Sequence, residues 1–586
     1  LIIAQQNRSA RRATSPDRSA PTGGSASKAS PTGMAIKSDL AEALAVIQSN
    51  HIDGRKLDYN AVFKSSISGM LSVLDPHSTY FDPVEYASFR TEQRSEYFGI
   101  GATIEDLRDG KEVNTYIRAT FPESPAARAG LRFGDRIVAI DGNSMRGKTF
   151  PEVRKVLIGP RGTTVKVTVE HEATKQPETV SIVRDAVSLP SIAQAYMLRP
   201  GVGYVAMTGG FNLTTAEEFD QALKYLHGKG MNMLVLDLRG NRGGLLIQAV
   251  RVANTFLQRG QMIVSQRGRF RDSSQSYAAF NENPDNVAVV VLVNGDTASA
   301  AEIVSQRGRF RDSSQQYAAV NENPDGVPVV VLVNGDTASA AEIVAGALQD
   351  HDRALIIGET TFGKGLVQFP FQLDYDSALL LTIAKYFTPS GRLIQRDYSN
   401  GGFYSYYFPG GLAGDKQNQT TAPTGPESHT DTGRAVYGGG GISPDEIVKP
   451  GTISLAERNL RDVLFAFALE LTTGRVQGFE QYKVQRAIEF DHELMNDDYP
   501  VTEALFTALK KFAAAKPNYK TTPEQLDKMR GYAEMQLRYN VLSAAYGYRT
   551  ATQVFNDSDP QISRAVDAMP RARELAQAAS RARARG

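Results

Sequence analysis

Apolar residues in the middle of the chain form short runs that alternate with stretches of helical periodicity. Runs at 202–207 and 233–238 are apolar throughout, and amphipathic stretches follow them at 216–226 and 245–257. Strands that are apolar on both faces and joined by helices are typical of a mostly parallel sheet covered on two sides. The pattern therefore predicts an α/β core over residues 187–450.

The region before this core, residues 95–186, follows a different pattern. Short runs with strand periodicity are separated by glycine-containing turns, at 101–104, 113–117, 136–140 and 164–170. Between the last two runs, residues 150–158 have the spacing of a helix. This arrangement predicts a small β-rich domain.

Helical periodicity dominates both flanks of the chain. In the N-terminal segment, residues 38–94, the apolar positions from Leu40 to Leu74 recur at helical spacing and predict two helices, and Ser38 is a residue type suited to an N-cap. Residues 451–586 contain stretches rich in Ala, Leu, Glu and Arg without strand signals, such as 459–472 and 523–548. We expect a helical N-terminal segment and a helical C-terminal region.

Residues 1–37 are predicted to form a disordered, basic tether. Positions 7–33 are mostly Ser, Thr, Pro, Gly, Ala and Arg, and they offer too little apolar surface to offset the entropy of ordering. The chain begins at Leu1 without Met, followed by Ile-Ile-Ala-Gln-Gln. This start fits either the end of a targeting segment or anchor, or an arbitrary fragment boundary.

Composition narrows the classes of function. The chain has 586 residues, more than one domain usually holds. Its 65 Lys and Arg against 64 Asp and Glu leave a net charge of +1, without the electrostatic signature of a dedicated nucleic-acid binder. The absence of Cys excludes disulfides, thiolate zinc sites and Cys nucleophiles. We expect no nucleic-acid partner, no metal and no cofactor.

A 40-residue repeat lies inside the predicted core. Residues 263–302 and 303–342 differ at only four positions, which are 276/316, 280/320, 286/326 and 288/328. Repeat architectures need about three copies, and those copies diverge much further. The pair therefore indicates a tandem duplication of one βα element, or an error in the sequence.

Both copies place a serine where an apolar strand meets a helix start. Ser299 and Ser339 each lie in Asp-Thr-Ala-Ser-Ala, directly after a Val-rich run. Free N–H groups and the helix dipole at such a junction stabilise an oxyanion, although Ser is also an ordinary N-cap. The paired glycines Gly243 and Gly244 end another strand and are candidates for a second oxyanion donor.

Lys364 is a candidate general base. It lies among small and apolar neighbours, where desolvation would lower its pKa, and on a strand it would share a face with Gln368. The alternative is a solvent-facing strand lysine. None of the seven histidines lies in a motif that identifies it as the base, although a triad assembled across the fold stays open.

A possible ligand loop opens the β-rich domain. In Phe98, Gly99, Ile100 and Gly101, the small glycines allow successive backbone N–H groups to converge. Such a nest ahead of a strand edge binds a peptide carboxylate. The simpler interpretation is a plain β-bulge.

Taken together, these motifs resemble the carboxyl-terminal processing peptidases, a family of Ser–Lys proteases. Each motif is short, but their joint order is hard to produce by chance. In chain order they are Leu74-Asp75-Pro76-His77-Ser78-Thr79-Tyr80, Phe98-Gly99-Ile100-Gly101, Asp237-Leu238-Arg239-Gly240-Asn241, Thr297-Ala298-Ser299-Ala300 with its copy Thr337-Ala338-Ser339-Ala340, Gly358-Glu359-Thr360-Thr361-Phe362-Gly363-Lys364-Gly365, Tyr386-Phe387-Thr388-Pro389-Ser390-Gly391-Arg392 and Gly440-Gly441-Ile442-Ser443-Pro444-Asp445.

The resemblance implies a multidomain α/β fold, in which a PDZ domain is inserted between the helical N-terminal segment and a crotonase-like protease core. It implies that a Ser attacks the scissile carbonyl, Lys364 takes its proton and Gln368 orients Lys364. The oxyanion donors would be the N–H of Ala340 and that of Gly243 or Gly244. The loop at 98–101 would capture a substrate C-terminus.

The family pattern has one nucleophile, and chain connectivity favours Ser339 over Ser299. An uninterrupted helix follows Ser339 and leads by a short path to Lys364, whereas Ser-Gln-Arg-Gly-Arg interrupts the helix after Ser299. The spare 40 residues are then expected to be extruded as an insertion.

We expect a serine endopeptidase that acts on proteins with free C-termini. The alternative is an inactive PDZ scaffold on a pseudoprotease core, and a crotonase-type acyl-CoA enzyme is a third hypothesis. The resemblance places the protein in the cell envelope, periplasmic or anchored to the membrane through a missing N-terminus. An adaptor or a second copy of the chain remains open as a further partner.

Overall fold

The computed structural model describes residues 33–172, 174–268, 313–319, 321, 323–398, 425–484, 488–490 and 492–584. It contains two compact units, residues 1–67 and 68–586, which are described separately. The predicted tether up to residue 32 and the alternative nucleophile Ser299 lie outside the described residues. Among the described residues, no helix is long and apolar enough to cross a membrane.

Helices make up the described part of the first unit. They are α1 (Gly33–Asn50) and α2 (Tyr59–Ser72), whose last residues belong to the second unit. The predicted N-cap at Ser38 is wrong, because α1 begins five residues earlier. The intervening residues include Met, Ala and Lys, which favour helix, so the helix extends past the serine.

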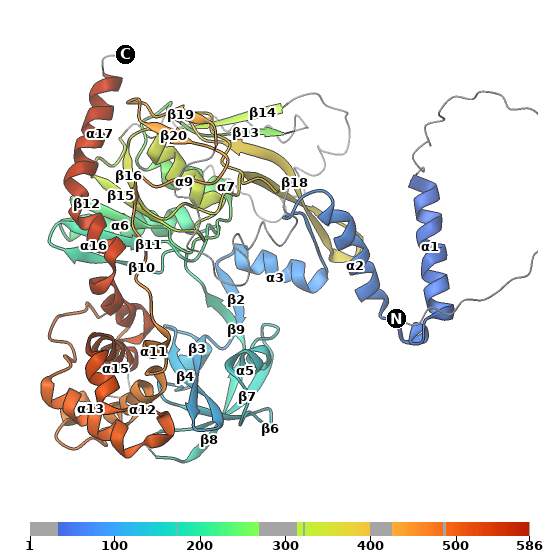
Figure 1. Cartoon of the computed structure of the whole chain (residues 1–586). Coiled ribbons are helices and arrows are strands. Elements are labelled where there is room, and N and C mark those ends of the chain that lie inside the picture. Colours follow the sequence, from blue (N-terminus) through green and yellow to red (C-terminus); the bar gives the residue numbers. More distant parts are fainter. Residues whose placement is uncertain are drawn as a thin grey trace, which may run out of the picture. The chain divides into compact units, whose positions relative to one another are not determined.

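A six-stranded sheet forms the centre of the second unit (Figure 1). Its order is β10 (Gln194–Arg199), β11 (Val202–Ala206), β12 (Met233–Asp237), β15 (Val329–Val333), β16 (Ala354–Gly358) and β21 (Glu446–Ile447). β10 and β11 are antiparallel, and the other neighbours are parallel. The apolar runs of the sequence become strands buried on both faces, as the α/β pattern predicted.

Helices cover both faces of this sheet. One face packs against α6 (Thr215–Gly228), α7 (Leu246–Asn254) and α9 (Ala340–Asp350). The other face packs against α16 (Pro560–Asp567) and α17 (Met569–Arg583), from the end of the chain (Figure 1). The C-terminal helices thus cover the face of the sheet opposite to α9, the helix that the candidate nucleophile precedes.

A second, antiparallel sheet adjoins the core and was not predicted. Its strands are β1 (Thr79–Phe81), β18 (Ala378–Phe387), β13 (Met262–Gly268), β14 (Ser313–Ala318) and β17 (Leu366–Gln372). The helical N-terminal segment predicted over residues 38–94 therefore also contains a strand. β1 pairs with β18, and only then does α3 (Pro83–Gln93) follow.

This second sheet joins the two copies of the repeat. β13 lies at the start of copy one, and it pairs with β14 from copy two. β15 lies in copy two, and α9 begins in copy two and continues beyond it. The described core therefore uses the beginning of one copy and the end of the other.

The β-rich domain forms its own sheet and small core. Its strands are β3 (Ala102–Asp109), β4 (Glu112–Thr120), β5 (Arg136–Ile140), β6 (Asn143–Ser144), β7 (Thr164–Glu170) and β8 (Pro177–Val183). The helices α4 (Pro125–Arg128) and α5 (Phe150–Leu157) accompany them. A two-stranded ribbon of β2 (Glu96–Gly99) and β9 (Asp185–Ser188) leads in and out of the domain.

The C-terminal helices divide between two partners. The first group packs against the β-rich domain, where Tyr116 and Phe133 join its apolar core. This group comprises α12 (Arg461–Thr472), α13 (Glu503–Ala515), α14 (Pro523–Lys528) and α15 (Arg530–Thr552), and the short helix α11 (Leu455–Arg458) precedes it. A short hairpin of β19 (Glu427–His429) and β20 (Ala435–Tyr437) precedes them. The described residues of 451–586 thus include these helices and no β-strand, and the helices do not share one core.

Candidate active site

Ser339 lies at the N-cap position of α9, directly after the turn that follows β15. Its backbone has φ 55° and ψ −117°. A non-glycine residue with positive φ is strained, and such residues cluster at functional sites where the surroundings hold them in place. The predicted strand–helix junction is therefore present, and it holds Ser339 in a strained conformation.

The glycine loop after β12 packs directly against Ser339. A Cβ atom at Gly243 would lie 2.7 Å from the Ser339 Cβ and 2.9 Å from the Ala340 backbone N, so only glycine fits. The Gly243 N–H donates to the Asn241 side chain (2.9 Å). Of the predicted oxyanion donors, the Gly243 N–H thus already has a partner, whereas Ala340 begins α9 beside Ser339.

Lys364 and Gln368 face each other. The Lys364 Nζ donates to the Gln368 Oε1 at 2.6 Å, and the Gln368 Nε2 donates to the His77 carbonyl at 2.7 Å. The prediction that Lys364 lies on a strand is wrong, because β17 begins only at Leu366. A register shift between Val367 and Gln368 breaks the simple alternation, yet the two side chains meet.

Burial governs the ionisation of Lys364. It lowers the pKa of the ammonium below the ordinary 10.5, and attraction to Asp75 and Glu342 opposes the change. Burial, and then repulsion by Lys364, lower the pKa of His77 to about 4. The amine is thus shifted toward the neutral form that a general base requires, and the nearby imidazole is neutral at physiological pH.

A buried carboxylate, Glu342, connects the two halves of the site. It accepts the backbone N–H of Ser339 (2.7 Å), of Gly363 (2.7 Å) and of Lys364 (2.9 Å), and also the Thr361 hydroxyl. The Glu342 side chain is fully buried, and burial raises its pKa against the effect of these hydrogen bonds. One side chain therefore fixes the backbone of both Ser339 and Lys364.

Tyr386, on β18, makes a second connection. Its hydroxyl lies 2.9 Å from the Ser339 carbonyl and 2.7 Å from the Lys364 carbonyl. Sequence reasoning assigned no role to Glu342 or Tyr386. The Glu three residues after Ser339 fits the capping-box pattern, which is a usable signal, whereas Tyr386 comes from a distant strand.

The candidate peptide loop, residues 98–101, covers the end of β2 and the two residues before β3. Phe98 and Gly99 pair with β9, and Gly101 has φ 75° and touches the Ser124 side chain. Among the described residues, no cluster of His, Cys, Asp and Glu could hold a metal ion.

Comparison with known protein families gives two matches. A model of peptidase family S41 matches residues 201–314 and 303–400, and a PDZ domain model matches residues 116–171. The S41 match has two stretches, and the second begins within the repeat, at residue 303. These matches define a serine-type peptidase that carries a PDZ domain.

Relatives narrow the class. A carboxy-terminal-processing protease of Bartonella bacilliformis is 35% identical over 345 residues, which is 58% of this chain and 68% of that protein. The carboxy-terminal processing protease CtpA of Bacillus subtilis is 32% identical, over 63% of this chain and 69% of that protein. A solved photosystem II D1 C-terminal processing protease is 30% identical and covers 57% of this chain and 79% of its own, with a TM-score of 0.31. The chain belongs to the carboxy-terminal processing proteases of peptidase family S41, and the predicted resemblance is confirmed.

Proposed function

We propose that this protein is a serine endopeptidase in which Ser339 is the nucleophile, Lys364 the general base and Gln368 the residue that orients the base. The observation that carries the proposal is that the Glu342 carboxylate accepts hydrogen bonds from the backbone N–H groups of both Ser339 and Lys364. A strained serine and a buried lysine tied to one carboxylate are the elements that a Ser–Lys mechanism needs.

In this mechanism the neutral Lys364 amine takes the proton of the Ser339 hydroxyl while Oγ attacks the scissile carbonyl. The N–H groups of Ala340 and Gly244 stabilise the oxyanion, since the Gly243 N–H is already bonded to Asn241. Collapse of the tetrahedral intermediate breaks the C–N bond, and the leaving amine takes the proton from Lys364. Water, activated by the same amine, then hydrolyses the acyl-enzyme.

The assignment to Ser339 is supported by the path of the chain. Ser339 begins α9, which leads through β16 to the loop that carries Lys364. A peptidase assay tests it: Ser339→Ala should abolish turnover of a peptide substrate, and the matched variant Ser299→Ala should retain it. Loss of activity in Ser299→Ala, with activity retained in Ser339→Ala, would reverse the assignment. An inactive wild-type chain would favour the PDZ scaffold instead.

We further propose that the PDZ domain, with bounds near residues 95–186, captures free C-termini of substrates at residues 98–101. The predicted location in the cell envelope is part of the same proposal. Amidating the C-terminus of a peptide removes the charge that the loop would bind. Binding to the full chain with Ser339→Ala should therefore weaken by about 1 to 3 kcal/mol. Equal affinity for acid and amide would contradict it.

A further inference from the structure

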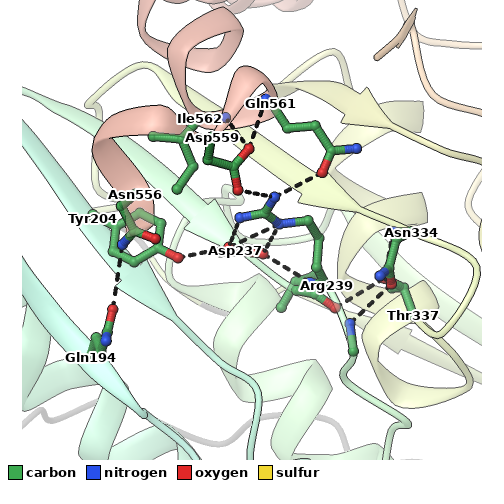
Figure 2. A network of polar contacts seen from close by, with 12 residues as sticks. Gln194, Tyr204, Asp237, Arg239, Asn334, Thr337, Asn556, Asp559, Gln561 and Ile562 are labelled. Carbon is green, nitrogen blue, oxygen red and sulfur yellow. Dashed lines mark hydrogen bonds and ion pairs between the residues drawn. The ribbon is translucent and has the colours of Figure 1, made fainter. Parts of the chain in front are cut away.

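A cluster of polar side chains lies behind the glycine loop, on the side of the sheet that the C-terminal helices cover (Figure 2). Its centre is Arg239, two residues beyond the end of β12. Asp237 binds the Arg239 guanidinium through both carboxylate oxygens (2.6 to 3.0 Å) and accepts the Tyr204 hydroxyl at 2.7 Å. The Arg239 side chain is 17% exposed and that of Asp237 only 4%.

Helix α16 supplies the other half of the cluster. The Arg239 Nη1 donates to the Asp559 Oδ2 at 2.6 Å and to the Gln561 Oε1 at 2.8 Å, across 320 positions of sequence in the first case. The second oxygen of Asp559 caps α16 by accepting the N–H of Gln561 (2.8 Å) and of Ile562 (3.2 Å). Asp559 therefore has two separable tasks, one for its own helix and one for Arg239.

From Arg239 the connection to the nucleophile is short. The next residue, Gly240, donates its N–H to the Asn334 side chain at 2.9 Å. The carbonyl of Asn241 accepts the N–H of Ala338 at 2.9 Å, and Ala338 directly precedes Ser339. Thr337 adds a bond from its hydroxyl to the Leu238 carbonyl at 2.9 Å. The loop that Arg239 anchors is thus bonded on both sides of that anchor to the nucleophile turn.

Two carboxylates, Asp237 and Asp559, hold the Arg239 guanidinium, and they hold it relative to different parts of the fold. Burial alone would lower the pKa of Arg239, but attraction to Asp237 and Asp559 outweighs it and raises that pKa. Asp237 belongs to the same loop, so it fixes Arg239 only relative to its own strand. Asp559 and Gln561 fix the guanidinium relative to a separate helix, and Gln561 also donates to the Val448 carbonyl at 2.6 Å.

We propose that Asp559 and Gln561, on the C-terminal helix α16, are positioning residues for catalysis, which hold the glycine loop and the Ser339 turn in place through Arg239. The inference rests on the proposed function, because its readout is the reactivity of Ser339. Under this proposal, full activity requires that the last helices pack on the sheet. The same packing also contributes to the fold.

The test uses Asp559→Asn in the full chain. Asn is as good an N-cap as Asp, so α16 keeps its cap while the charge facing Arg239 is lost. We expect the rate of labelling by a fluorophosphonate probe to fall about tenfold, because a small displacement of reacting groups is costly. The kcat for a peptide should fall with it, and KM should stay near the wild-type value.

Arg571→Ala is the matched control. It removes an ion pair from α17 to Glu446 on the core without touching Arg239. It should label at the wild-type rate. Asp559→Ser, which also keeps a capping oxygen, replaces the Asn variant if that protein does not fold.

A double-mutant cycle separates positioning from simple fastening of the helix. In an Arg239→Met background, Asp559→Asn should cause no further loss of labelling rate. A wild-type labelling rate in Asp559→Asn, or an equal loss in both backgrounds, would overturn the inference. Failure of the proposed function itself is recognised separately, because wild-type protein would then not label at all.

Discussion

Two carboxylate clusters hold the turn that carries Ser339, and they do so by different means. On the inner side, Glu342 is fully buried and is bonded to backbone N–H groups and a hydroxyl. On the outer side, Asp237 and Asp559 share the charge of Arg239, and the Asp559 side chain is 20% exposed. We call these the inner hub and the outer hub.

The difference indicates a division of labour. The inner hub bonds the backbone of both proposed catalytic residues, and its charge acts on Lys364. The outer hub contacts neither residue directly and reaches the site through residues 238–244. Changes at the inner hub should therefore alter chemistry, ionisation and stability together. Changes at the outer hub should mainly alter geometry, with a small loss of stability and no effect on the ionisation of Lys364.

The largest effect is expected from the proposed base. Lys364→Ala should reduce peptide turnover about 100-fold to 10,000-fold, because the nucleophile loses its proton acceptor. Gln368→Ala should cost less, about tenfold, since it disturbs orientation and leaves the amine in place. Steady-state kinetics on folded variants measures both. Near-normal turnover in Lys364→Ala at neutral pH would reopen a histidine base.

Variants at the two hubs should differ in their loss of unfolding free energy. Glu342→Gln puts an amide group against backbone donors and leaves at least one buried N–H without an acceptor, so unfolding should become easier by about 2 kcal/mol. Asp559→Asn should cost about 1 kcal/mol or less, because its ion pair is partly exposed. Denaturant unfolding of the two variants makes the comparison. A larger loss in Asp559→Asn would reverse the ranking of the hubs.

The pH dependence of turnover should distinguish charges that act on Lys364 from those of the outer hub. Activity should rise with pH as Lys364 loses its proton, with a midpoint below the ordinary 10.5. Asp75 favours the charged ammonium, so Asp75→Asn should lower the pKa of Lys364 further and move the midpoint to lower pH. Asp559→Asn should leave the midpoint where it is. A midpoint that moves upward in Asp75→Asn would contradict the cause assigned to the pKa of Lys364.

The smallest effect is expected from removing the duplication. Deleting 263–302 joins Met262 to Ile303, and residues 303–308 have the same sequence as 263–268 in β13. Both hubs remain intact, so turnover and melting temperature should equal or exceed those of the full chain. Loss of activity on deletion would show that copy one contributes to the site.

Local sequence patterns were sufficient to predict the elements that are determined by residues close together in the chain. The predicted strands 136–140 and 164–170 coincide with β5 and β7, because alternation and glycine turns fix such hairpin strands. The second sheet was missed because its strands come from distant parts of the chain. β1 has only three residues, too few for a periodic signal.

The same limit applies to the site. Ser339, Lys364 and Gln368 could be selected because each lies in a short motif, and Lys364 and Gln368 are only four residues apart. The partnership of Arg239 with Asp559 has no local signal, since tertiary packing of α16 brings together residues 320 positions apart. The burial of Arg239 and its ion-pair partners therefore could not be predicted from the motif that contains it.

The most direct measurement is to map the adduct of a fluorophosphonate probe by mass spectrometry after tryptic digestion. The sequence differences between the copies give Ser299 and Ser339 distinguishable peptides, 272–307 and 312–353. The account predicts that the phosphonyl group is on Ser339 and that labelling is lost in Lys364→Ala. An adduct on Ser299, or labelling at the full rate without Lys364, would contradict it.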